Sequence, residues 1–135
     1  MPTISVEDTK GGRYYLIDDK RYISVTTPLS ILSVPHLEVW RARIGKSKAD
    51  LIATKAANYG SRIHKFCSDI CEGKEVAPTK AYETDVLAVK DWITKNVKRV
   101  HLVETVVYSD LYQVAGRYDF LGEIIGLPGL TIVDW

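Results

Sequence analysis

Two aspartates, Asp119 and Asp134, have the residue type and spacing needed to bind a divalent cation. Both lie in segments rich in β-branched residues, which predict neighbouring strands of one hairpin. A connecting loop of either two or four residues puts them on the same face of the sheet, about 4.5–8 Å apart. Carboxylates this close repel each other unless a cation lies between them, and a hard divalent cation prefers oxygen ligands. The alternative is that both acids lie at solvated strand ends and are structural.

The elements that must position these aspartates follow from hydrophobic periodicity. Strands with a two-residue period are predicted at residues 101–108, 113–125 and 130–135, with a turn at 126–129. Helices with three- and four-residue apolar spacing are predicted at residues 35–44, 47–72 and 80–96. A hairpin at residues 13–25 comes first, and a short helix capped by Thr27 before Pro28 runs to Leu32. This order predicts an α/β (mixed α+β) fold with helices on an antiparallel meander.

The bulk composition predicts one soluble domain. The chain has 135 residues, of which 46% are hydrophobic and 26% charged, and no apolar run approaches the length of about 20 residues that crosses a bilayer. The N-terminus lacks a signal-peptide pattern, so a cytoplasmic location is expected. We expect residues 1–46 to form the hairpin and short helices, residues 47–99 a helical part, and residues 100–135 a three-stranded catalytic sheet.

The local charge clusters and the two cysteines indicate less about function than the aspartates do. The net charge of +1 does not indicate a nucleic-acid partner, so DNA binding would depend on local clusters. The basic residues that cluster locally are Arg41, Arg43, Lys46 and Lys48, and separately Lys95, Lys98 and Arg99. Cys67 and Cys71 lie four residues apart on one predicted helix. Two reduced thiols near the core are the simpler interpretation, and a redox or metal pair is the alternative.

Five segments resemble parts of the RecB-like PD-(D/E)xK nucleases and follow the family's order along the chain. Gly116-Arg117-Tyr118-Asp119 followed by Ile132-Val133-Asp134-Trp135 is similar to their GxxD and (I/V)D(W/Y)K motifs. Residues 59–64 (YGSRIH) resemble the G(T/S)xxH segment of the family's helix. Residues 24–27 and 40–45 resemble the N-terminal parts of phage exonucleases and mitochondrial genome maintenance exonucleases. The resemblance implies a restriction-endonuclease-like core and a Mg²⁺- or Mn²⁺-dependent hydrolysis of DNA phosphodiester bonds.

The resemblance also implies roles for individual residues. The implied catalytic residues are Asp119, Asp134, His64 and Glu104, and the implied metal ligands are His64, Asp119, Asp134 and the carbonyl group of Trp135. For Glu104, a solvated strand glutamate is an equally good interpretation. The chain departs from the family at Ser68, where many members have a glutamate four residues after the helix histidine.

The family pattern extends beyond this sequence. Its lysine would directly follow Trp135, and a helix and a strand complete its core, so the resemblance implies an incomplete nuclease domain with impaired catalysis. The uncovered sheet surface predicts self-association of the chain. The resemblance implies DNA as the partner, and no membrane contact is expected. The alternative function is a catalytically inactive, nuclease-like DNA-binding or assembly module. A third interpretation is an unrelated α+β domain whose acids are structural.

Overall fold

The computed structural model describes residues 1–30, 32 and 34–135. Its elements follow the chain as β1 (Ile4–Thr9), β2 (Gly12–Ile17), β3 (Lys20–Ser24), α1 (Thr26–Leu29), α2 (Pro35–Ile44), α3 (Lys46–Cys71), α4 (Lys80–Asn96), β4 (Val97–Ser109), β5 (Val114–Ile124) and β6 (Thr131–Val133). The strand order is β1-β2-β3-β5-β4, and β6 pairs with β5. The mixed α+β class is thereby confirmed.

The chain divides into two compact units, each built from segments distant in sequence. The first contains Met1–Glu38 and Val106–Arg117, and the second contains Val39–Thr105 and Tyr118–Trp135. The sequence-based expectation of a single domain stays a prediction.

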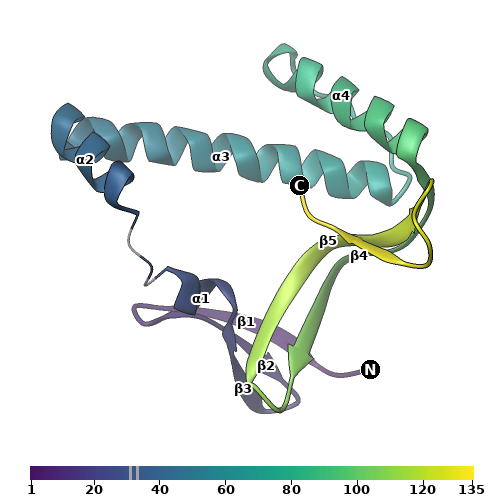
Figure 1. Cartoon of the computed structure of the whole chain (residues 1–135), viewed down its shortest axis with the longest axis horizontal. Coiled ribbons are helices and arrows are strands. Elements are labelled where there is room, and N and C mark those ends of the chain that lie inside the picture. Colours follow the sequence, from purple (N-terminus) through teal and green to yellow (C-terminus); the bar gives the residue numbers. More distant parts are fainter. Residues whose placement is uncertain (31, 33) are drawn as a thin grey trace. The chain divides into compact units, whose positions relative to one another are not determined.

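The first unit is built on the antiparallel meander β1-β2-β3 (Figure 1). Ile17 pairs with Lys20, so Asp18 and Asp19 alone form the β2–β3 turn, with φ of 46° and 65°. Aspartate tolerates this left-handed backbone better than most residues, which suits it to the turn. The antiparallel pairing of β2 with β3 confirms the hairpin predicted at residues 13–25. β1 was not predicted from the sequence. All of its residues are exposed, so it lacks the buried alternate positions that make a strand recognisable.

A parallel strand pair, which was not predicted, joins the N-terminal hairpin to the C-terminal meander, whose predicted antiparallel pairing is confirmed for β5 and β6. Ile23 and Ser24 of β3 pair with Val114 and Ala115 of β5 in parallel. Parallel neighbours need a long crossover, and periodicity within a strand does not specify its distant partner. Ala115 completes a buried cluster formed by the side chains of Tyr15, Ile17, Tyr22 and Ala115. This core explains why the N-terminal hairpin belongs to the sheet.

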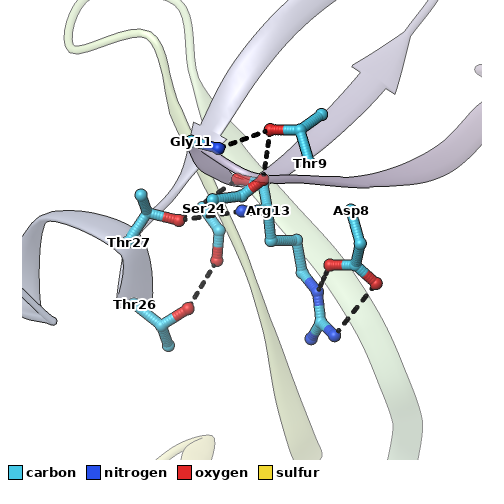
Figure 2. A network of polar contacts seen from close by, with 8 residues as sticks. Asp8, Thr9, Gly11, Arg13, Ser24, Thr26 and Thr27 are labelled. Atoms are coloured by element: carbon cyan, nitrogen blue, oxygen red, sulfur yellow. Dashed lines mark hydrogen bonds and ion pairs between the residues drawn. The ribbon is translucent and has the colours of Figure 1, made fainter.

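The start of α1 also differs from its prediction. The helix begins at Thr26, and no side chain caps it, so the predicted Thr27 cap is wrong. The Thr27 hydroxyl instead accepts a hydrogen bond from the backbone N–H of Arg13 at 3.1 Å, within the polar network of Figure 2. A Cβ at Gly12 would lie 2.2 Å from Thr27 Cγ2, so this approach requires glycine. α1 ends at Leu29, and the predicted extension to Leu32 passes through Ile31, outside the described residues.

The second unit contains α3 and α4, whose predicted bounds are confirmed to within one residue. α3 runs without a break through Gly60 (Figure 1) and is followed by Gly73 at a φ of 76°. Rings join the two helices: Tyr59 stacks on Tyr82 at a centroid distance of 4.9 Å, and Phe66 lies 5.8 Å from Tyr82.

The apolar stripe of α3 is buried only in part, which corrects its prediction as a continuous core face. Ile52 is 43% exposed, whereas Cys67, farther along the helix, is buried. α3 has 26 residues and α4 has 17, so the shorter helix cannot cover the full length of the longer one. Over the described residues, no helix combines the length and the apolar character that a membrane crossing requires.

Candidate metal centre

The β5–β6 hairpin sets the two aspartates opposite each other. The pairs Phe120–Val133 and Leu121–Ile132 define a register that continues to Asp119 and Asp134. This is the register predicted for a two-residue loop, although the connecting segment between the paired strands is longer. Asp119 is buried at 7% exposure, whereas Asp134 is exposed. Burial raises the pKa of Asp119, and the neighbouring Asp134 adds to that rise.

Trp135 holds Asp119 through its backbone. Its amide N–H donates a hydrogen bond to Asp119 Oδ2 at 2.6 Å. Its ring packs edge-on against Trp92 of α4 at 5.6 Å and lies 5.6 Å from the Phe120 ring. The resemblance pointed to the Trp135 carbonyl group, but sequence reasoning missed the amide and the ring of Trp92.

One turn of α3 contacts acidic residues from two strands. His64 Nδ1 lies 3.4 Å from Asp119 Oδ1. Four residues later, the Ser68 hydroxyl donates to Glu104 Oε1 at 2.7 Å. Residues at this spacing lie on the same helix face, so His64 and Ser68 point toward the same side. Three of the residues expected at the site, His64, Asp119 and Glu104, therefore all meet this helix turn.

Glu104 occupies a strained position in β4. Its φ is 49°, in the left-handed region where a residue other than glycine costs roughly 1–3 kcal/mol. β4 runs antiparallel to β5, since Ile125 N–H donates to the Asn96 carbonyl group at 2.8 Å and His101 meets Glu123 at 2.9 Å. An irregular backbone inside a strand redirects its side chain, as a β-bulge does. Glu104 is therefore directed toward Ser68 by a local distortion that periodicity does not predict.

Burial dominates the electrostatics of this site. It raises the pKa of Asp119, the Trp135 amide and His64 act against that rise, and the charge of Asp134 adds to it. Burial also raises the pKa of Cys67 and of Cys71 to about 11, and the negative charge of Asp119 contributes at both thiols. Both cysteines are free and stay protonated at neutral pH, which agrees with the simpler interpretation of reduced thiols.

The donor chemistry at Asp119 fits a hard or borderline divalent cation. Two facing carboxylates and an imidazole nitrogen are ligands that Mg²⁺ and Mn²⁺ accept. In the part of the chain described by the structure, no three His, Cys, Asp or Glu side chains are grouped closely enough to hold a metal ion. Trp135 and His64 already contact the two oxygens of Asp119. A cation at Asp119 would therefore replace one of these contacts.

The basic clusters expected to contact DNA are partly neutralised. Arg41 forms an ion pair with Asp50, Lys95 with Asp91, and Lys98 with Glu123. Exposed side chains of the first cluster include Arg43, Lys46 and Lys48. Surface ion pairs of this kind contribute little to stability, so these lysines and arginines can still exchange partners.

No protein-family model, curated protein or solved structure matches this chain. The nuclease function therefore stays a prediction from the sequence motifs.

Proposed function

We propose that this chain supplies the metal-binding residues of a Mg²⁺- or Mn²⁺-dependent DNA exonuclease of the RecB-like PD-(D/E)xK type. The observation that carries the proposal is the buried Asp119, with Asp134 opposite it in the hairpin and His64 Nδ1 at 3.4 Å. A buried carboxyl group whose pKa is raised next to a second acid is a recurring feature of functional sites. Structural acids on a sheet are more often solvated or paired with a basic residue.

Each residue of the site has a separate proposed role. Asp119 and Asp134 would bind the cation, His64 would become a further ligand by exchanging its contact with Asp119 for one with the ion, and the Trp135 amide would orient Asp119. When bound, a divalent cation polarises the scissile phosphate and lowers the pKa of the attacking water. Glu104, held by Ser68, would orient water or the cation's ligand shell from the neighbouring strand. DNA phosphates would meet exposed basic residues such as Lys46 and Lys48.

Isothermal titration with Mn²⁺ tests the metal centre. The chain should bind Mn²⁺, and combining Asp119→Ala with Asp134→Ala should abolish the binding heat. The matched control replaces two exposed acids of α4, Glu83→Ala with Asp91→Ala, and should bind as the unsubstituted chain does. Equal heats for the unsubstituted chain and the Asp119/Asp134 variant would remove the metal site and the proposal with it.

A catalytically inactive DNA-binding or assembly module is the second candidate. It is favoured by the contacts that already engage both oxygens of Asp119, because a structural carboxylate would be satisfied in this way. A labelled DNA substrate separates the two functions. Degradation that requires Mn²⁺ supports the nuclease, whereas filter binding at low salt without metal or cleavage supports the binding module.

A further inference from the structure

Ser68 is an unusual residue on α3 because its side chain is both polar and buried. It is 8% exposed, and the described residues include only two other buried polar or charged side chains, Ser24 and Asp119. A serine inside a helix commonly turns its hydroxyl group to the carbonyl group four residues earlier, and the His64 carbonyl oxygen is available at 3.0 Å. The buried Ser68 hydroxyl group therefore has two possible partners with different meanings. A bond to the His64 carbonyl oxygen would be an ordinary feature of a helix, whereas a bond to a residue of the candidate site would be functional.

The hydroxyl group has one proton, and two acceptors compete for it. Glu104 Oε1 is closer at 2.7 Å, against 3.0 Å for the His64 carbonyl oxygen. A hydrogen bond to an ionised carboxylate is shorter and about twice as strong as one between neutral groups. The proton of Ser68 is therefore directed at Glu104.

The backbone of Glu104 supplies independent support. Its φ of 49° lies within β4, where neighbouring residues are extended. Such a conformation persists only where surrounding contacts determine it, and it occurs most often at functional sites. The contact with Ser68 is one such determinant, and it joins Glu104 to the helix turn whose His64 meets Asp119.

We infer that Ser68 is a positioning residue for the metal centre: its buried hydroxyl group fixes the orientation of the Glu104 carboxylate on the helix turn that contacts Asp119. This inference rests on the proposed function. Outer-shell groups around a metal site, the role proposed for Glu104 and the hydroxyl group that holds it, typically change metal affinity by about 10- to 100-fold when they are removed.

Mn²⁺ affinity, measured by isothermal titration, is the readout. Ser68→Ala should weaken Mn²⁺ binding about tenfold or more, and Ser68→Thr, which keeps a hydroxyl group, should recover most of that loss. Ser47→Ala, at an exposed serine of the same helix, is the matched control and should change nothing. In a Glu104→Ala background, which has no side-chain acceptor for the Ser68 hydroxyl group, Ser68→Ala should add no further loss, because both substitutions remove the same hydrogen bond.

Several results would overturn the inference. One is an affinity of Ser68→Ala within about twofold of Ser47→Ala; another is a full additional loss in the Glu104→Ala background. If circular dichroism shows Ser68→Ala to be unfolded, Ser68→Cys decides, because a thiol keeps the volume but is a weak donor. Ser68→Cys should bind Mn²⁺ about tenfold or more weakly than the unsubstituted chain, and binding like the unsubstituted chain overturns the inference.

The failure of this inference is distinguishable from failure of the proposed function. Unchanged Mn²⁺ binding when Asp119 and Asp134 are both replaced by alanine, or no binding by the unsubstituted chain, removes the metal centre and this inference together. Loss of binding in that variant, combined with ordinary binding by Ser68→Ala, removes only the role of Ser68.

Discussion

The edge contact between Trp92 and Trp135 should contribute measurably to folding. Replacing a fully buried tryptophan with alanine costs about 3–5 kcal/mol, and Trp92 is 38% exposed. Roughly two-thirds of that cost applies, so Trp92→Ala should lower the free energy of unfolding by about 2–3 kcal/mol. This includes about 0.5–1.5 kcal/mol for the pairing of the rings, whose planes meet at 81°.

Urea denaturation followed by far-UV circular dichroism measures this loss. A domain of this size has an m-value of about 1–3 kcal/mol/M, so the midpoint should fall by roughly 1–2 M. Trp92→Phe keeps a ring against Trp135 and should lose about half as much or less. Leu87→Ala, at an exposed position of α4, should stay within about 0.5 kcal/mol of the unsubstituted chain.

A Trp92→Ala midpoint that matches the Leu87→Ala midpoint would contradict a stabilising role for the Trp92 ring. In that case the ring of Trp92 would not support Trp135, and the amide of Trp135 would hold Asp119 without help from α4. A large loss in both Trp92→Ala and Trp92→Phe would also contradict the expectation, because the aromatic contact would not be what matters.

Three other substitutions test the site, its strand β5 and the helix α3. The raised pKa of Asp119 means that the folded chain holds this proton more tightly than the unfolded chain, so the stability it contributes is present at acidic pH and is lost as pH rises through the folded pKa. Asp119→Asn stays neutral, so it should melt at a higher temperature than the unsubstituted chain at neutral pH, with the gap closing in acid; a lower melting temperature at neutral pH contradicts this. Gly122→Ala would bring a Cβ to 2.6 Å from the Arg99 carbonyl oxygen and should cost about 1–3 kcal/mol in urea denaturation. Gly60→Ala, in open space on α3, should instead gain about 0.8–1 kcal/mol, and equal midpoints for the two glycine variants would argue against the close approach.

Local patterns predicted much of the second unit. α4 was predicted with its observed bounds. The apolar spacing that predicts a helix is contained within the segment itself, so it can be read without knowing the distant contacts. The facing positions of Asp119 and Asp134 also followed locally, since an even loop length in a hairpin keeps both side chains on one face.

The contacts that complete the candidate site were not predictable in this way. Ser68 and Glu104 are 36 residues apart, and their hydrogen bond depends on a backbone distortion at Glu104 that no residue pattern indicates. The parallel pairing of β3 with β5 depends likewise on a partner distant in sequence. His64 was singled out by family resemblance alone, and its contact with Asp119 required the three-dimensional arrangement.

The group that holds Asp119 Oδ2 belongs to the peptide chain and not to a side chain. Every amino acid except proline carries the same N–H, so residue 135 can change its chemical identity and still provide this donor. The side chain is still restricted in size and shape, because the ring at this position packs against Trp92 and Phe120. Random mutagenesis at codon 135 should accordingly return other large aromatic residues among metal-binding clones and exclude proline.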